Sequence, residues 1–314
     1  MSVLSNMVAM KDVSHVTWRG FTFEATRGTA ITLSGGKENR IIGCTIRNVG
    51  GWAVTVSGGS GHSIVGCDMY QMGGGGISLS GGDRTSLTPA GHLAENNHIH
   101  HYARVKRVYQ PGIQLRGVGN RAAHNLIHDA PHMGMGFSGN DHLIELNEIH
   151  NVCTESNDAG AIYTGRNWTY RGNIVRYNFV HHIQDGVDGG GSATRVAHLD
   201  DSVSGTTFRG NILYRTGGGV SICGGPCTVV DNNIFVDCRP ALHIDARAMN
   251  WASYHVATTM TDPGQIRLLD TTSGQVRPLD VTINPDLPQL RPGWKDARRA
   301  MGQASLSPTG QRAV

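Results

Sequence analysis

The chain has 314 residues, a formal net charge of +3 and 16% charged residues, so its length allows one large domain or two ordinary ones. No apolar run reaches the roughly 18 residues of a transmembrane helix, and the basic cluster at 104–107 is too short to predict a nucleic-acid-binding surface. With 43 glycines and no helix-period stripe of useful length, the sequence favours many turns and an all-β chain. We therefore expect neither a membrane nor a nucleic acid as partner.

A short stretch of alternating apolar and polar residues recurs from the N-terminus onward, usually followed by glycine. Such alternation is typical of half-buried strands. Its apolar members are predicted to face inward, from Ile31 and Leu33 in the first copy to Leu242 and Ile244 in the last. The copies occupy residues 30–36, 53–59, 76–82, 112–117, 134–139, 161–165, 197–201, 219–225 and 241–247.

Asparagine marks a second recurrent position, two residues before an apolar one. The six copies are Asn97, Asn125, Asn147, Asn178, Asn211 and Asn233, at steps of 28, 22, 31, 33 and 22 residues. Cys44 and Cys67 take the same place upstream, 23 residues apart. Stacked coils would align these side chains, and their amides would then bond to one another along the stack.

Each repeat thus holds two or three short strands in about 22 residues or more, and one coil cannot bury its own apolar face. The pattern predicts a single-stranded parallel β-helix, a solenoid of about nine coils between Val13 and Arg247. We expect residues 1–250 to form the β-helix domain and residues 251–314 an irregular or capping segment.

The outward residues of the second strand change character along the chain. The first three coils offer only Thr and Ser, whereas the later coils offer aromatic, basic and acidic groups. This composition is typical of a carbohydrate-binding groove, in which carboxylates act as acids and bases and aromatic rings pack against sugars. The predicted substrate-binding residues are Arg116, His132, Tyr163, Arg166, Trp168, His198, His243 and Asp245, with no cofactor and no metal.

Four phrases of the chain resemble bacterial right-handed parallel β-helix proteins, most closely glycoside hydrolase family 141, which contains α-L-fucosidase and xylanase activities. They are HDAPHMGMGFSGNDHLIELNEIHNV (128–152), NDAGAIYTGRNWTYRGNIVRYNFVHH (157–182), HLDDSVSGTTFRGNILYRTGGGV (198–220) and VVDNNIFVDCRPALHIDAR (229–247). The resemblance implies a right-handed parallel β-helix and a catalytic pair of aspartates. The matching positions are Asp158 in the DAG phrase and one of Asp200 and Asp201 in the LDD phrase.

The resemblance implies a bacterial, secreted or periplasmic glycoside hydrolase that degrades a plant or microbial polysaccharide or oligosaccharide. A polysaccharide lyase is the first alternative, because Arg116, Arg166, Tyr163 and His198 offer candidate bases beside the groove. A non-catalytic glycan-binding solenoid is the second. The oligomeric state, the sugar and its linkage stay open. Asp158 also has a plain structural alternative as a turn residue, because Asn-Asp-Ala-Gly is favourable turn sequence.

Overall fold

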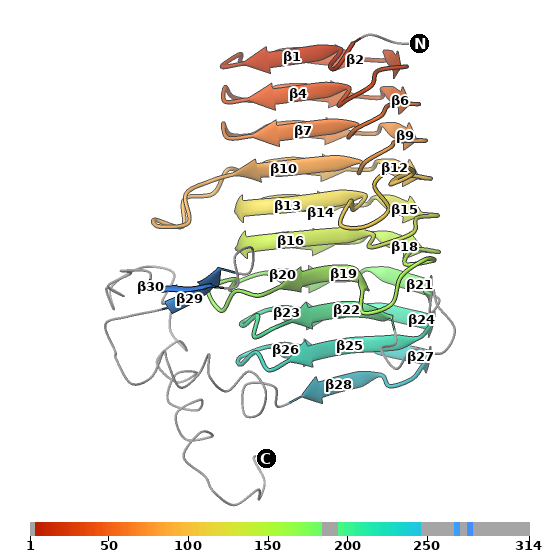
Figure 1. Cartoon of the computed structure of the whole chain (residues 1–314), viewed down its shortest axis with the longest axis vertical. Coiled ribbons are helices and arrows are strands. Elements are labelled where there is room, and N and C mark those ends of the chain that lie inside the picture. The colour runs from red at the N-terminus through yellow and green to blue at the C-terminus, as the bar shows by residue number, and fades with distance from the viewer. Residues whose placement is uncertain (1–3, 184–193, 246–266, 271–274, 279–314) are drawn as a thin grey trace, which may run out of the picture.

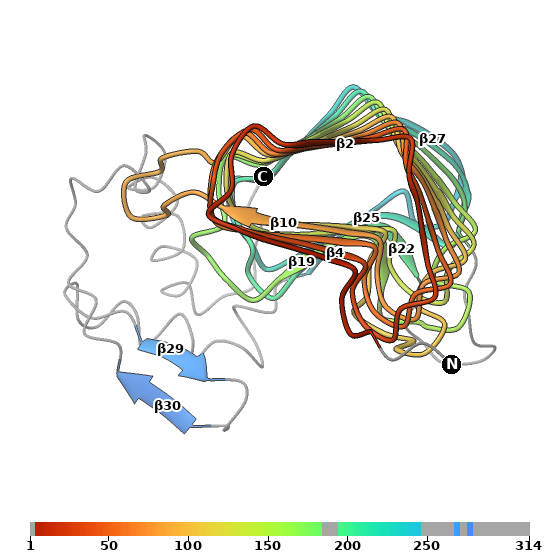
Figure 2. The same cartoon turned by 90° about the horizontal axis from the view of Figure 1, so that it is seen from above.

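The computed structural model describes residues 4–183, 194–245, 267–270 and 275–278. Its strands form three long parallel sheets that run the length of a stack of coils (Figure 1), and Figure 2 looks along that stack. Each coil contributes one strand to each sheet, so the chain is a parallel β-helix as predicted. No helix in the described part of the chain is long and apolar enough to cross a membrane.

Sheet 1 has ten strands, sheets 2 and 3 have nine each, and a separate antiparallel pair follows. Sheet 1 contains β1 (Val8–Lys11), β4 (Ile31–Ser34), β7 (Val54–Ser57), β10 (Ile77–Gly81), β13 (Ile113–Val118), β16 (Met135–Asn140), β19 (Gly160–Gly165), β22 (Arg195–Asp200), β25 (Gly218–Cys223) and β28 (Leu242–Asp245). Sheet 2 contains β2 (Thr17–Arg19), β5 (Arg40–Ile42), β8 (Ser63–Val65), β11 (Leu93–Glu95), β14 (Arg121–Ala123), β17 (Leu143–Glu145), β20 (Ile174–Arg176), β23 (Thr207–Arg209) and β26 (Val229–Asp231). Sheet 3 contains β3 (Thr22–Glu24), β6 (Thr45–Arg47), β9 (Asp68–Tyr70), β12 (His98–His100), β15 (Leu126–His128), β18 (Glu148–His150), β21 (Phe179–Ile183), β24 (Ile212–Thr216) and β27 (Ile234–Cys238).

The predicted coil boundaries need one addition. β1 pairs with β4 and lies before Val13, where the sequence pattern placed the start of the first coil. Of the predicted C-terminal segment, the structure describes the antiparallel strands β29 (Arg267–Asp270) and β30 (Gln275–Pro278). The rest of that segment lies outside the described residues.

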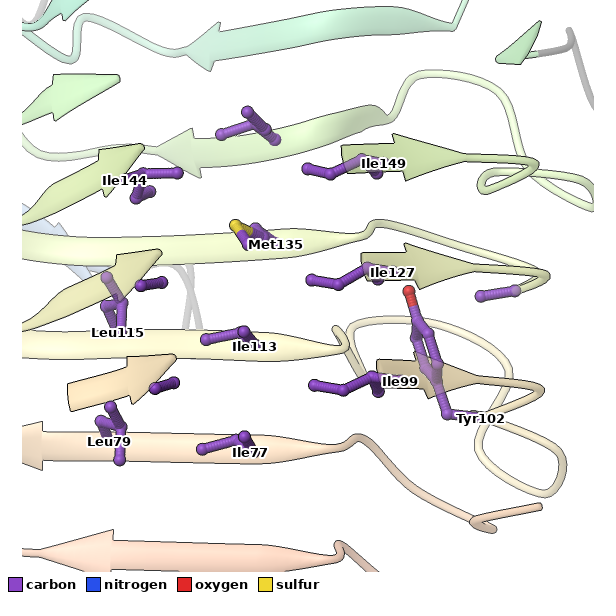
Figure 3. Close-up of a cluster of buried hydrophobic side chains, with 14 of the residues drawn as sticks. Ile77, Leu79, Ile99, Tyr102, Ile113, Leu115, Ile127, Met135, Ile144 and Ile149 are labelled. Atoms are coloured by element: carbon purple, nitrogen blue, oxygen red, sulfur yellow. The ribbon is translucent and has the colours of Figure 1, made fainter. Parts of the chain in front are cut away.

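The core lies between the three sheets and is filled by stacked aliphatic side chains (Figure 3), among them Ile77, Ile113 and Met135 of sheet 1. The predicted inward residues of sheet 1 from Ile31 to Ile222 are buried, which confirms the alternation. Each fully buried aliphatic side chain contributes about 1.5–3 kcal/mol relative to an exposed one. Leu242 and Ile244 are exposed instead, although they pair in register with Val220 and Ile222, because no further rung covers them in the described part of the chain.

The asparagine ladder is present as predicted. Its members are Asn97, Asn125, Asn147, Asn178, Asn211 and Asn233, and in each of the first five the backbone N–H donates to the side-chain oxygen of the next at 2.8–3.0 Å. Cys67 continues the ladder upstream by donating its N–H to Asn97 Oδ1 at 3.1 Å. The residue before each member has a positive φ, so the chain turns sharply there from sheet 2 to sheet 3.

A second buried ladder, not predicted, lies at the turn between sheets 1 and 2, where asparagine and histidine share one column. Its members are Asn39, His62, His92, Asn120, His142 and Asn173, and each accepts the backbone N–H of a residue one coil earlier. Since each histidine accepts at Nδ1, its Nε2 carries the proton in the neutral ring. Burial lowers the pKa of His92 and of His142 to about 4 in each case.

This ladder predicts a loss of stability in mild acid. The unfolded chain binds protons at histidine near pH 6.5, whereas buried His142 stays neutral until about pH 4, so the free energy of unfolding should fall as pH drops between these values. The fall should be about 3 kcal/mol for His142 and should level off below pH 4. His142→Asn, which places asparagine between Asn120 and Asn173, should lose correspondingly less stability in urea unfolding at pH 7 and pH 4.5. Arg84 is the charged group beside His142 and is unchanged in the variant. Equal losses in both proteins would contradict this account.

Candidate functional site

Chemically active side chains form a column on the outer face of sheet 1, in the C-terminal half of the stack. Tyr163 of β19 pairs in register with His198 of β22, which pairs with Ser221 of β25, which pairs with His243 of β28. Tyr163, His198 and Ser221 alternate with buried core residues, as the predicted outward direction requires. His243 lies in register with them on the last rung, between the exposed Leu242 and Ile244. The regular pitch of the sheet therefore brings residues from four coils into one row.

Asp200 lies at the centre of this face. Its Oδ2 accepts a hydrogen bond from the Tyr163 hydroxyl at 2.9 Å, and its Oδ1 lies 3.5 Å from His198 Nε2. Burial on its own lowers the pKa of His198, but the adjacent Asp200 and Cys223 outweigh it and raise that pKa to about 9. Burial and the Asp200 charge raise the pKa of Tyr163 well above its usual range. At neutral pH the carboxylate is thus held between two protonated partners.

Asp201 follows Asp200 directly but occupies a different environment. It has a positive φ of 35°, and its carboxylate faces Arg166, with Oδ2 at 3.1 Å from Nε. Its backbone N–H donates to Asp200 Oδ1 at 3.0 Å. The ion pair between Arg166 and Asp201, two of the predicted site residues, therefore joins the turn after β19 to the turn after β22 beside Asp200.

His132 and Tyr109 extend the face toward the N-terminus. His132 is 5% exposed, burial lowers its pKa, and its Nδ1 has no hydrogen-bond partner among the described residues. The Tyr109 ring lies 5.0 Å from the His132 ring and 6.4 Å from the Tyr163 ring, between centroids. Two aromatic rings and an imidazole thus line one side of the face.

Cys223 adds a buried thiol to the same face. His198, Asp200 and Cys223 each offer one donor atom, and these atoms all lie within 4.8 Å of one another. Ser221 beside them is 2% exposed and contacts Cys223, with 3.4 Å between Oγ and Sγ. An imidazole, a carboxylate and a thiol in this arrangement are capable of binding a zinc-like ion, although the sequence predicted no metal here.

Asp158 is not brought to this cluster by the strand register. It is exposed, has a φ of 48° and precedes β19, whereas Asp200 pairs with Gly165 at the opposite end of β19. The five residue steps from Gly160 to Gly165 span about 16 Å. That separation exceeds the roughly 5–9.5 Å of the carboxylate pairs in glycosidases. Its exposed turn geometry agrees with the structural alternative for Asp158.

The remaining predicted residues lie around the cluster or beyond it. Arg116 on β13 is directed toward the N-terminal coils, where it donates to Ser78 Oγ at 3.2 Å. Trp168 is half-buried in the turn after β19. On the last rung His243 faces Asp245, with 3.8 Å between Nε2 and Oδ2. Residues 184–191, a glycine-rich insertion between Asn178 and Asn211, lie outside the described residues.

Tyr109 and Cys223 were missed by sequence reasoning. Tyr109 comes from the long connection between β12 and β13, which carries no repeat pattern, so only its length and its aromatic residue signalled it. Cys223 stands in the outward row of β25, but a cysteine in a solenoid is more often a small buried residue.

Comparison with known proteins supports the architecture. A family model described as "Right handed beta helix region" matches residues 6–89. A solved structure named "Glycoside hydrolase" is similar at a TM-score of 0.50 and 16% sequence identity, over 70% of this chain and 41% of that one. The chain thus spans about two fifths of the length of that structure. No curated protein matches. The family match identifies the fold as a right-handed parallel β-helix, and the similarity to the solved structure is one of fold.

Proposed function

We propose that this β-helix acts on carbohydrate, and that it hydrolyses glycosidic bonds at the outer face of sheet 1 with Asp200 at the reactive centre. The observation that carries the proposal is the convergence of Tyr163, His198 and Asp200 from neighbouring coils. A carboxylate fixed from both sides is oriented before substrate arrives, which lowers the entropy cost of reaction.

Asp201 is the second carboxylate in this proposal. It follows Asp200 at the end of β22 and is held by Arg166. Glycoside hydrolysis uses two carboxylates, one as acid and the other as nucleophile or base, and water completes the cleavage. The proposal leaves Asp158 outside this centre, because it precedes β19, whereas Asp200 pairs with Gly165 at the other end of that strand.

The aromatic side chains supply the sugar-binding surface. The Tyr109 ring lies near both the Tyr163 ring and the His132 ring, at centroid distances of 6.4 and 5.0 Å. Sugar rings present apolar C–H faces that pack against such rings, while their hydroxyls bond to polar neighbours. The shared fold with a protein named a glycoside hydrolase is consistent with this use of the face, and family 141 is the specific group we propose.

The structure disfavours the lyase alternative with Tyr163 as base. A lyase needs a group that removes a proton from carbon beside an acidic sugar. Because burial and Asp200 raise the pKa of Tyr163, its phenolate is scarce at neutral pH.

The test is a product assay on the purified chain with neutral and acidic polysaccharides. We expect new reducing ends without the ultraviolet absorbance of an unsaturated uronate. Reducing ends together with that absorbance would identify a lyase. Binding without any product would identify a non-catalytic glycan-binding solenoid and overturn the proposal.

A further inference from the structure

A row of stacked rings runs along the outer face of sheet 3, on a different sheet from the proposed reactive centre. Tyr70, His100, His128, His150 and His181 stack with centroid distances of 5.2, 5.0, 4.6 and 4.8 Å in order. The four histidines pair in register on successive strands of sheet 3, so their rings form a ladder. At its N-terminal end a second outward row, with Asp68 and His98, lies beside it.

Three donor atoms converge at this end. Asp68 Oδ1 lies 3.1 Å from His98 Nδ1 and 3.7 Å from His100 Nε2, and all three atoms lie within 4.8 Å of one another. A zinc ion with ligands at about 2.0–2.1 Å holds neighbouring ligands about 3.3 Å apart. His98 and His100 alternate on one strand, so both project outward, and Asp68 is the register partner of His98.

The hydrogen-bond network decides which nitrogens carry protons. His128 Nδ1 donates to Asp129 Oδ2 at 2.8 Å, so in the neutral ring His128 Nε2 is an acceptor. It therefore accepts from His98 Nε2 at 2.8 Å, which leaves His98 Nδ1 with a lone pair. That lone pair faces the carboxylate oxygen of Asp68 without a proton between them.

The position of the proton on His100 depends in the same way on its neighbour, His101. His101 Nε2 faces Asp129 Oδ2 at 3.9 Å, and His100 Nδ1 lies 2.8 Å from His101 Nδ1. In the tautomer that carries the His101 proton on Nε2, toward Asp129, His100 Nδ1 is the donor and His100 Nε2 keeps its lone pair. Asp68 Oδ1 is shielded from solvent and has no hydrogen-bond partner among the described residues. With these rings neutral, the three donor atoms direct lone pairs toward one point.

We propose that Asp68, His98 and His100 bind a divalent first-row transition metal such as zinc, and that Asp129 positions both imidazoles through His128 and His101. A cation relieves the repulsion between the converging lone pairs. Two imidazoles and one carboxylate leave at least one coordination position for water or another ligand. The remote nitrogen of each ligating histidine is held by a neighbour, as is usual around protein metal ions.

Nearby charge supports a cation at this point. Arg47 on the preceding coil is the positive group on this side, and it is paired with Glu24 and bonded to the Tyr70 hydroxyl at 3.0 Å. The carboxylates in contact with these histidines are those of Asp68 and Asp129. None of the three proposed ligands lies on sheet 1, so the metal-binding proposal can be tested independently of the proposed glycan hydrolysis.

The test is zinc titration by calorimetry of the full chain without a histidine tag. We expect binding to the wild type that weakens at least about 10-fold in Asp68→Asn and in His98→Asn. Asp129→Asn should also weaken it about 10-fold or more while leaving all three ligands in place. His15→Asn is the matched control, because His15 is exposed and faces a single carboxylate, that of Glu38 at 3.4 Å. Circular dichroism establishes that each variant stays folded.

Cobalt distinguishes this site from the other donor groups. At Asp68, His98 and His100 it should give visible bands without a sulfur charge-transfer band, whereas binding at Cys223 would show that band and lose it in Cys223→Ser. A further group contains Glu148, His150 and His181. Binding that survives Asp68→Asn and His98→Asn, or that is lost in Glu148→Gln or Cys223→Ser instead, overturns the proposal, as does an absence of binding in the wild type.

Discussion

Replacing Asp200 with asparagine is expected to reduce turnover of the glycan identified by the product assay by about 10²–10⁴-fold, the usual contribution of an acid–base group. Asparagine has the same shape. Its Oδ1 keeps the bond from the Asp201 N–H, and its Nδ2 can donate to the Tyr163 hydroxyl oxygen, so the fold and the face should persist. The loss should appear in kcat more than in KM, because the carboxylate acts in the transition state. Steady-state kinetics of wild type and variant measure it.

Asp158→Asn is the matched control for that experiment. The change is chemically identical, but Asp158 lies at the opposite end of β19 from the register partner of Asp200, so its turnover should stay within about twofold. Asp201→Asn should reproduce the defect of Asp200→Asn. If Asp158→Asn loses turnover and Asp200→Asn keeps it, the reactive centre lies before β19 and the present assignment fails.

Replacing Asn125 with alanine is expected to destabilise the chain by about 3–5 kcal/mol. The Asn125 amide is 1% exposed, and its Oδ1 accepts from the backbone N–H and the Nδ2 of Asn97 at 3.0 and 2.9 Å. Its Nδ2 donates to Ala94 O and Asn147 Oδ1. Removal leaves these buried groups unsatisfied, and each costs about 1–3 kcal/mol. The midpoint of urea unfolding reports the change.

Asn233→Ala is the comparison within the same ladder. Asn233 accepts the corresponding bonds from Asn211, at 2.8 and 3.0 Å, but it is only half-buried on the last rung of the ladder. Water can therefore satisfy the orphaned groups, and the loss should be about 1 kcal/mol. A similar cost at both positions would mean that burial does not decide the strength of this ladder.

The repeat was predictable because one physical cause acts in every coil. Ile77, Ile113 and Met135 stack on one another in register, so each has apolar neighbours on the adjacent coils and each coil requires an apolar residue at that place. Asn97 and Asn125 recur for the same reason, since each must satisfy an N–H on the adjacent coil. The second ladder was not predicted, because it has no single recurring residue type. His92 accepts a backbone N–H with an imidazole nitrogen, and Asn120 accepts one with an amide oxygen.

The candidate site was only partly predictable, because it depends on contacts between coils and loops of irregular length. The outward direction of Tyr163 and His198 follows from alternation, but the bond from Tyr163 to Asp200 depends on the register of β19 with β22. Tyr109 reaches the face from the connection between β12 and β13, which lies outside the repeated strand pattern. Asp158 was assigned by resemblance, which carries no information on where a turn places a side chain.

The regular spacing of the first coils means that the number of coils can change without changing the proposed reactive centre. Ile31, Val54 and Ile77 succeed one another in register at intervals of 23 residues, as do Cys44 and Cys67 on the way between sheets. Removing residues 44–66 joins Gly43 to Cys67 and leaves every inward side chain above the same kind of neighbour. These first coils are thus a modular spacer, in which evolution can add or delete a whole coil without moving an atom around Asp200.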